Sequence, residues 1–337
     1  MAQFPNRRSG RRNREAVRFT QSRGERSISL TQMRTLLRGS VLLAAITLGS
    51  ACSDGGENSA KSPEVAKPCK KTVFGGARPT TIGVPTMYRC EKAATLVVVL
   101  HGYTGTGAGT VDYLGMKAES EKRGFLYLAP DGTKDGAGNQ FWNASAACCD
   151  FGQTKVDDSA YISKLIDDVA TEWNVDSKRV YLVGHSNGGF MSYRMACEHS
   201  GQIAAIASLA GAMRADAATC KSAEPVSVVQ IHGTADTTIR FEGGEIFANP
   251  YPAATQSVAD WQKTNGCKTK ATTSANEDDL DLDKSLAGDD TDVALYSKCG
   301  GKTEVALWTI KDGVHTPALT PGFAAAVVDF FEAHPKS

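Results

Sequence analysis

Apolar runs and amphipathic stretches alternate between residues 96 and 333 of this 337-residue chain. Short runs of aliphatic and β-branched residues are typical of parallel strands that are buried on both faces. Apolar residues spaced three and four positions apart predict helices instead. These patterns predict strands at 96–100, 125–128, 180–183, 204–209, 226–231 and 305–310, and helices at 158–173, 188–199, 255–263 and 323–333.

The order of these elements predicts the fold class. Strands that alternate with helices along a chain form an α/β structure, in which helices cover both faces of a mostly parallel central sheet. Residues 69–337 are the right length for one domain of this kind. We therefore predict a three-layer α/β sandwich built from a single catalytic domain at 69–337.

The motif with the clearest chemical meaning is Gly184-His185-Ser186-Asn187-Gly188. It follows a predicted strand and begins a predicted helix, which is the context of the G-x-S-x-G nucleophile elbow. The turn from strand to helix is so tight that the neighbours of the nucleophile must be small. The pattern therefore predicts Ser186 as a nucleophile, and the alternative is a glycine-rich turn without chemistry.

A serine nucleophile needs a histidine base and a carboxylate that orients the base. In this fold the acid and then the base follow the serine along the chain. His315 lies in a loop after the last predicted strand, and Asp236 lies in a loop after the strand at 226–231. His199 lies at the end of a predicted helix and His232 at the end of a predicted strand, so a packing or capping role accounts for these two histidines. We predict His315 as the base and Asp236 as the acid.

The oxyanion of the reaction needs two preorganised N–H donors. The main-chain N–H of Asn187, directly after the nucleophile, is the first candidate. The second candidate is the N–H of Tyr103, in the loop that follows the strand at 96–100. Trp142, in a long loop before the helix at 158–173, is either a wall of the substrate pocket or a local core residue.

The N-terminal segment predicts export. Residues 41–48 are apolar and follow arginines, but they are too few to span a bilayer, which needs about 20 apolar residues. Small residues follow at 49–51, and then Cys52. This layout is typical of a signal peptide. It resembles a lipoprotein signal in which Cys52 is lipidated, and cleavage after Ala51 by ordinary signal peptidase is the alternative.

We therefore interpret residues 1–51 as an export leader and residues 52–68, rich in Gly, Ser, Glu, Lys and Pro, as a flexible tether. A start at Met33 would give a compact signal peptide, and a long leader is the other interpretation of residues 1–32. The mature protein is expected outside the cytoplasm, with a membrane link only through a lipid on Cys52. We expect a monomer.

The formal net charge of zero hides two unlike parts. Residues 1–40 contain ten Arg and two Glu, a net charge of +8, so the rest of the chain carries −8. With 41% hydrophobic and 22% charged residues, the composition argues against a disordered or multi-span membrane chain. An acidic body does not attract nucleic acid or an anionic membrane by charge. We expect no nucleic-acid partner.

The chain has nine cysteines. If Cys52 carries the lipid, eight remain, an even number that fits disulfides in an oxidising compartment. Order along the chain favours Cys69–Cys90 and Cys267–Cys299, with the four cysteines between them, at 148, 149, 197 and 220, pairing among themselves. Zinc is the competing interpretation, but no CxxC pair is present. We expect neither a metal nor another cofactor.

Residues 276–292 are acidic and rich in turn-forming residues. Asp279, Asp281 and Asp283 alternate and Asp290 follows, which is a weak match to a calcium-binding loop. Lys284 stands where such a loop needs glycine. The segment is therefore predicted to be a solvated loop.

Eight motifs lie at 100–102, 129–132, 141–143, 148–149, 156–158, 184–189, 232–236 and 313–315. Together they resemble those of the secreted polyhydroxybutyrate depolymerase and feruloyl esterase-like family of α/β-hydrolases. The resemblance implies an α/β-hydrolase fold and hydrolysis of carboxylic esters by Ser186, His315 and Asp236, without a cofactor. It leaves polyhydroxyalkanoate-type oligoesters and feruloyl or other aromatic esters open as substrates. A peptidase or acyltransferase with the same triad, and a non-catalytic surface-binding lipoprotein, are the alternatives.

Overall fold

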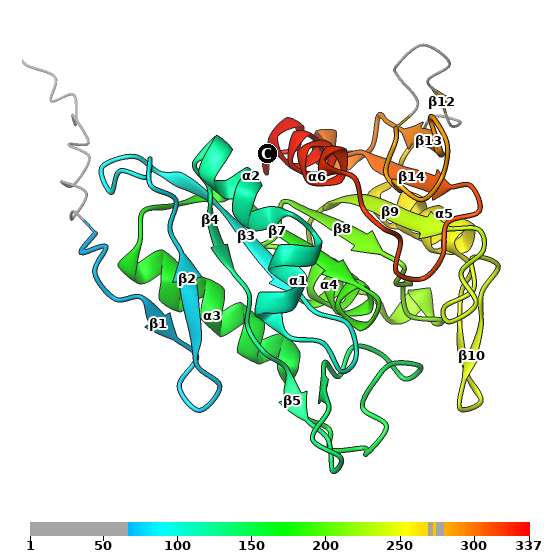
Figure 1. The fold of residues 1–337 in the computed structure, drawn as a ribbon, viewed down its shortest axis with the longest axis horizontal. Helices are drawn as coiled ribbons and strands as arrows, with labels where there is room; N and C mark the ends of the chain where they lie inside the picture. The colour runs from blue at the N-terminus through cyan, green and yellow to red at the C-terminus, as the bar shows by residue number, and fades with distance from the viewer. Residues whose placement is uncertain (1–66, 269–271, 274–279) are drawn as a thin grey trace, which may run out of the picture. The chain divides into compact units, whose positions relative to one another are not determined.

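A ten-stranded sheet is the centre of the computed structural model, which describes residues 67–268, 272–273 and 280–337 (Figure 1). All of these residues belong to one unit, 62–337. The six central strands are parallel and the strands at both edges are antiparallel. In spatial order the strands are β1 (Val73–Phe74), β2 (Thr80–Gly83), β4 (Leu126–Leu128), β3 (Ala94–Leu100), β7 (Val175–His185), β8 (Ala205–Leu209), β9 (Ser227–Gly233), β14 (Val305–Ile310), β13 (Thr291–Tyr296) and β12 (Thr272–Thr273).

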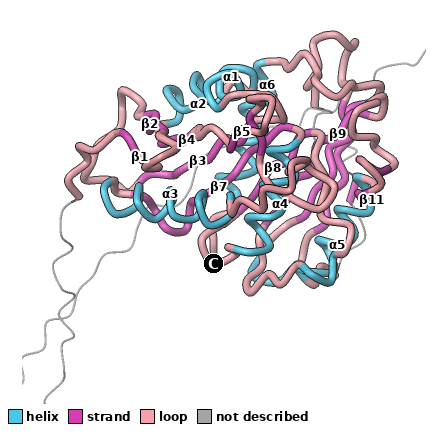
Figure 2. The backbone as a smooth tube through the Cα atoms, turned by 90° about the horizontal axis from the view of Figure 1, so that it is seen from below, coloured by secondary structure: helices cyan, strands magenta, loops and turns pink. Residues whose placement is uncertain are grey.

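Helices cover both faces of this sheet (Figure 2). One layer consists of α1 (Gly107–Tyr113), α2 (Met116–Arg123) and α6 (Pro321–Ala333), and the other of α3 (Asp158–Glu172), α4 (Asn187–Glu198) and α5 (Ala254–Asn265). The described residues also form two short 3₁₀ helices, Ala217–Thr219 and Gly300–Lys302. The layers form a three-layer α/β sandwich, as the order of elements predicted.

Strand β3 shows why its sequence is apolar without interruption. Leu96, Val98 and Leu100 belong to the core under the α3, α4 and α5 layer. Val97 and Val99 belong to the core under the α1, α2 and α6 layer. Successive side chains of a strand point to opposite faces, so a sheet covered on both faces needs apolar residues at every position.

Each predicted strand and helix is present, with boundaries that move by a few residues. The pattern missed the short helices α1 and α2 and the strands at the edges of the sheet. Helix α2 is rich in Lys and Glu and lacks a wide apolar face, and α1 spans only Gly107–Tyr113. The pattern also missed two small hairpins outside the main sheet, formed by β5 (Thr133–Lys134) with β6 (Gln140–Phe141) and by β10 (Gly244–Ile246) with β11 (Asn249–Tyr251).

Four disulfides link the cysteines of the described residues. Cys69–Cys90 and Cys267–Cys299 are present, as chain order predicted. The four cysteines between them do pair among themselves, as Cys148–Cys149 and Cys197–Cys220. The predicted leader, tether and lipidation site at Cys52 lie outside the described residues. Within the described residues, no helix has the length and apolarity required to span a membrane.

The prediction of a solvated loop at 276–292 is wrong for its two best-placed carboxylates. Asp283 and Asp290 are buried. Asp290 accepts hydrogen bonds from the main-chain N–H groups of Leu282 and Asp283, and Asp283 accepts one from Ala318. These carboxylates satisfy buried main-chain donors next to α6, and the described residues contain no cluster of three or more potential metal ligands. Asp279 lies outside the described residues.

Candidate active site

Ser186 occupies the turn between β7 and α4 in a backbone conformation that few residues adopt. Its φ is 54° and its ψ is −118°, and its main-chain N–H donates to the carbonyl of Leu209 over 2.7 Å. A Cβ on Gly184 would overlap the backbone of Gly188, and a Cβ on Gly188 would overlap the backbone of Leu100. The two glycines of the motif are therefore required by the close approach of β7, α4 and β3.

The side chains of Ser186, His315 and Asp236 form a continuous hydrogen-bonded series. The Oγ atom of Ser186 lies 2.9 Å from Nε2 of His315. On the other side of the ring, Nδ1 of His315 lies 2.8 Å from Oδ2 of Asp236. Ser186 follows β7, Asp236 follows β9 and His315 follows β14. Because parallel strands bring their carboxyl ends to one edge of the sheet, the three residues lie close together. The geometry brings together the three residues predicted as nucleophile, base and acid.

Asp236 is a buried carboxylate with several donors. The main-chain N–H groups of Thr238 and Ile239 donate to Oδ1 over 2.8 and 2.9 Å. Burial raises the pKa of Asp236, but hydrogen bonds from His232 and His315 and the charge of His315 outweigh it and hold the pKa well below its ordinary value. Asp236 is therefore ionised at neutral pH and can accept a hydrogen bond from His315.

His232, which its position at a strand end predicts to be a packing or capping residue, contacts the same carboxylate. It is buried in β9, and its Nε2 lies 2.7 Å from the carbonyl of Ile239 and 3.3 Å from Oδ2 of Asp236. The side-chain amide of Gln230 lies 3.1 Å from Nδ1 and can donate to it, which places the proton of His232 on Nε2. The sequence does contain a signal for this contact, because His232 stands only four residues before the predicted acid.

The loop after β3 lies beside the nucleophile. A Cβ on Gly102 would be 3.3 Å from Cβ of Ser186 and 3.2 Å from Nδ1 of His185, so the backbone of this loop borders Ser186 closely. Among the described residues, the main-chain N–H of Tyr103 has no main-chain acceptor outside the helices and strands, and the N–H of Asn187, the first residue of α4, has no acceptor within its helix. Both groups are available to a ligand at this position, as an oxyanion site requires.

His101 holds this loop in place and was not predicted to have a role. The side chain is fully buried, and its Nε2 accepts a hydrogen bond of 2.8 Å from the N–H of Gly132. The proton of the neutral ring must then lie on Nδ1, which donates to the carbonyl of Gly102 over 2.7 Å. Burial lowers the pKa of His101, which favours this neutral ring.

Trp142 does not form a solvent-exposed pocket wall, which was one of its two predicted roles. Its side chain is completely buried, and its indole N–H donates to the carbonyl of His101 over 3.1 Å. Its main chain exchanges two hydrogen bonds with the side-chain amide of Asn187, of 2.7 and 2.9 Å. Trp142 is the local core residue of the alternative, and it joins the loop after β3 to the start of α4.

His185, the residue before Ser186, supports the loop of the predicted base. Its Nε2 lies 2.8 Å from the main-chain carbonyl of His315, and its ring contacts the ring of Tyr113 edge to face at 5.4 Å. Burial lowers the pKa of His185 to about 4. The ring is therefore neutral at pH 7 and donates one hydrogen bond to the loop that carries His315.

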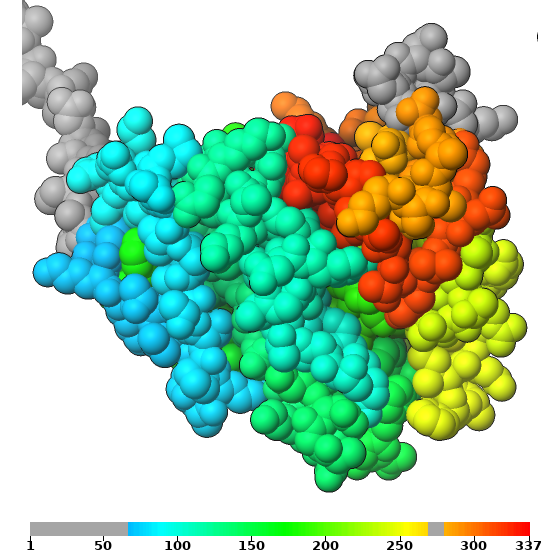
Figure 3. Space-filling view, in the orientation of Figure 1, coloured from blue at the N-terminus to red at the C-terminus, as the bar shows by residue number. Residues whose placement is uncertain are grey.

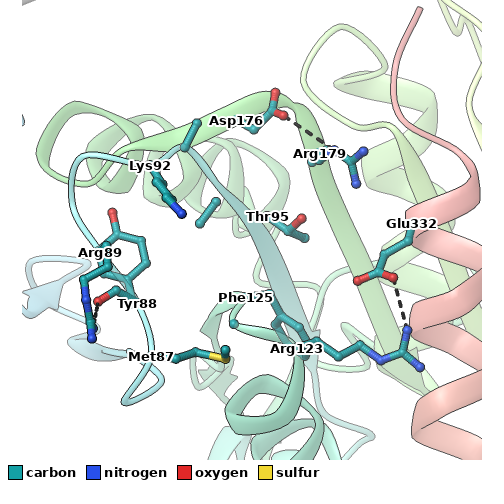
Figure 4. A pocket seen from close by; sticks show the side chains of 13 residues that line it. Met87, Tyr88, Arg89, Lys92, Thr95, Arg123, Phe125, Asp176, Arg179 and Glu332 are labelled. Carbon is teal, nitrogen blue, oxygen red and sulfur yellow. Dashed lines mark hydrogen bonds and ion pairs between the residues drawn. The ribbon is translucent and has the colours of Figure 1, made fainter.

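A cavity on the described surface lies far from this cluster (Figure 4). It is lined by residues at the amino ends of β3 and β4 and near the start of β7, whereas Ser186 follows the carboxyl end of β7. Arg123 and Arg179 in its wall are paired with Glu332 and Asp176. The cavity and the Ser186, His315 and Asp236 side chains therefore lie at opposite edges of the sheet.

A nucleophile elbow at the carboxyl edge of a parallel sheet, with a histidine and a carboxylate on later loops, defines an α/β-hydrolase. The chain belongs to the phospholipase/carboxylesterase family, whose model matches residues 87–266. This match confirms the fold class, and together with the relatives below it confirms the resemblance to feruloyl esterase-like α/β-hydrolases. The resemblance to polyhydroxybutyrate depolymerases stays a prediction.

Curated relatives match part of the chain. Feruloyl esterase B of Piromyces equi is 27% identical over 248 residues, which are 71% of this chain and 42% of the relative. The putative esterase NocK of Nocardia uniformis subsp. tsuyamanensis is 30% identical over 161 residues, 48% of this chain and 44% of the relative. The chain thus spans less than half the length of both. Probable feruloyl esterase C of Aspergillus flavus is 25% identical, over 69% of this chain and 78% of the relative.

Solved structures share the fold at low sequence identity. The acetyl xylan esterase from Aspergillus awamori superposes with a TM-score of 0.54 at 16% identity, over 75% of this chain and 93% of that chain. A thermostable esterase superposes with a TM-score of 0.51 at 15% identity, over 78% of this chain and 62% of that chain. These similarities establish the α/β-hydrolase architecture and nothing finer.

Proposed function

We propose that this protein is a serine carboxylic ester hydrolase in which Ser186 is the nucleophile, His315 the base and Asp236 the acid. The observation that carries the proposal is the unbroken series of hydrogen bonds from Oγ of Ser186 through the ring of His315 to Oδ2 of Asp236. The family assignment and the names of the esterase relatives support it.

The reaction proceeds in two halves. His315 takes the proton of Ser186 at Nε2 while Oγ attacks the ester carbonyl, and the main-chain N–H groups of Tyr103 and Asn187 stabilise the oxyanion. The protonated His315 then donates to the leaving alcohol, which gives an acyl-enzyme. Water, activated by the same histidine, attacks this ester and releases the acid and free Ser186. Asp236 keeps the proton on Nδ1 of His315 and stabilises the imidazolium.

The substrate is an ester of the feruloyl or aromatic class or a polyhydroxyalkanoate-type oligoester. Feruloyl esterases among the relatives favour the first class. The four disulfides fit an oxidising compartment and support export. The proposal also includes anchoring through a lipid on Cys52 and a monomeric state.

Hydrolysis of p-nitrophenyl butyrate by the wild-type protein and Ser186→Ala tests the proposal. Removal of the nucleophile should lower kcat at least about 10³-fold, with an unchanged melting temperature. Full activity of Ser186→Ala would show that the serine mechanism is wrong. A matched amide substrate and an added acceptor alcohol distinguish an esterase from a peptidase and an acyltransferase. A folded wild-type protein without activity on any of these substrates would favour the non-catalytic alternative.

A further inference from the structure

Three aromatic side chains contact one another in series next to the proposed oxyanion site. The rings of Tyr103 and Phe151 meet edge to face with centroids 5.3 Å apart, and those of Phe151 and Phe247 do so at 5.0 Å. We call these three residues the aromatic arm. They come from three separate segments: the loop after β3, the loop between β6 and α3, and the tip of the β10–β11 hairpin. The segments around residues 150 and 247, green and yellow in Figure 3, lie side by side.

The inner end of the aromatic arm lies beside Ser186, His315 and Asp236, which we call the proposed catalytic cluster. Tyr103 supplies a proposed oxyanion donor, and the preceding Gly102 borders Ser186. The phenol of Tyr103 donates a hydrogen bond of 2.6 Å to Asp135, which holds the ring in one orientation. A group bonded to a reacting carbonyl at Ser186 would therefore begin next to Tyr103.

The outer end of the arm is exposed. Phe151 is 42% exposed and Phe247 is 78% exposed, among the few large hydrophobic side chains of the described residues that face solvent. An isolated exposed apolar residue is ordinary, but contiguous apolar surface beside a reaction site is typical of ligand binding. These two rings are in contact with each other, and they continue from the site.

The backbone under Phe247 adopts an unfavourable conformation. Ile246 pairs with Asn249, so Phe247 and Ala248 form a two-residue turn, with φ values of 47° and 63°. Such turns favour Asn-Gly, because left-handed backbone is costly for residues that carry a Cβ. A phenylalanine here stabilises neither the turn nor a core, since its ring is mostly exposed. Strain of this kind is concentrated at functional sites.

Both outer segments are anchored at their bases. Tyr251 of the hairpin is buried and packs against Phe190 of α4, and its hydroxyl accepts a hydrogen bond from the N–H of Arg240. The N–H of Phe151 donates to the carbonyl of Cys149, and Cys148 lies 3.4 Å from the side-chain amide of Asn187. The positions of Phe151 and Phe247 are thus tied to the helix that follows the nucleophile.

We propose that the aromatic arm binds the ring of an aryl acyl group and makes this protein prefer aryl acyl esters over aliphatic ones. This inference rests on the proposed esterase function. An edge-to-face contact gives an aromatic ring more binding free energy than its buried area alone provides, whereas a flexible alkyl chain gains only the free energy of its buried area. In an aryl acyl ester a few bonds separate the carbonyl from the ring, which matches an arm that begins at an oxyanion donor and extends outward.

The test compares methyl cinnamate with methyl butyrate, two esters with the same leaving group, by titration of the released acid. The measured quantity is the ratio of kcat/KM for the two esters. Phe247→Ala and Phe247→Leu should lower this ratio about fivefold, and Phe247→Trp should keep it. Met87→Ala, at an exposed apolar residue in the cavity of Figure 4, is the matched control and should change neither rate.

The outcomes separate the inference from the proposed function. An unchanged ratio in Phe247→Ala, or an equal loss on both esters, would overturn the aromatic arm while leaving the esterase intact. Activity of Ser186→Ala on both esters would instead overturn the esterase. If Phe247→Ala changes the sedimentation coefficient without changing the ratio, the exposed rings bind a second copy of the chain and the inference is wrong.

Discussion

The proposed catalytic cluster of Ser186, His315 and Asp236 lies next to the aromatic arm, but the two groups of side chains are held in different ways. Each polar group of the cluster has a hydrogen-bond partner, and Asp236 is buried. The outer rings of the arm are exposed, and one of them lies on a turn with left-handed backbone. The ends of the parallel strands position the proposed triad, whereas loops outside the sheet present the proposed substrate-binding surface.

The largest expected effect comes from Asp236→Asn. The amide would favour the wrong tautomer of His315 and would not stabilise the imidazolium, so kcat should fall about 10⁴-fold. Stopped-flow or long-incubation assays with p-nitrophenyl butyrate measure this loss, and a melting curve checks the fold. A loss below tenfold would mean that Asp236 does not orient the base. The ratio for aryl and aliphatic esters should not change, since the arm is untouched.

Gly188→Ala should destabilise the protein by about 3 kcal/mol, because the new Cβ would overlap the backbone of Leu100 and force β3 and α4 apart. Urea denaturation measures the free energy of unfolding. Gly136→Ala is the matched control, since nothing lies within 4 Å of a Cβ added there. If both variants are equally stable, the elbow is not packed too closely for a Cβ at position 188, and this prediction is wrong.

His185 gives the stability of the cluster a pH dependence. Its pKa is about 4 in the folded protein against an ordinary 6.5, so the unfolded chain binds more protons between these values. Stability should fall as the pH is lowered from 6.5 to 4, by about 2 kcal/mol from this residue. His185→Gln should remove that part of the loss in urea denaturation at pH 7 and 4.5. Equal pH dependence in both proteins would contradict the assignment.

The smallest expected effect is a gain of stability, from a substitution in the aromatic arm. Phe247→Gly should stabilise the protein by about 1 kcal/mol, because glycine adopts the positive φ of the turn without a Cβ clash. Val73→Gly, at an exposed strand residue, should destabilise it by about the same amount. A variant that gains stability but loses the preference for aryl esters would show that the turn is kept for binding. A loss of stability in Phe247→Gly would remove that argument.

Local pattern predicted the parallel strands of the sheet, the longer helices and Ser186, and the order in which acid and base follow the serine in this fold predicted Asp236 and His315. A strand covered on both faces is apolar throughout, and the elbow needs glycines at fixed spacing. The aromatic arm has no such pattern, because Tyr103, Phe151 and Phe247 meet only through the packing of three loops. The buried partners His101 and His232 were missed for a related reason, since their hydrogen bonds depend on residues that the fold brings together.

For Trp142 and the acidic segment at 276–292, the sequence does not determine which side chains are buried. An aromatic residue in a long loop was as compatible with a pocket wall as with a core, and the hydrogen bonds to Asn187 place it in the core. Asp283 and Asp290 looked solvated because their neighbours are polar, and only the fold reveals the main-chain donors that they satisfy.

The proposed function requires Ser186, at the end of β7, to be an activated nucleophile. Labelling with a fluorophosphonate probe, followed by peptide mass spectrometry, tests this claim most directly. The wild-type protein should carry one adduct, on the peptide that contains Ser186, and both Ser186→Ala and Asp236→Asn should lose or strongly slow the labelling. A folded wild-type protein that is not labelled, or that is labelled at another residue, would show that Ser186 is not an activated nucleophile.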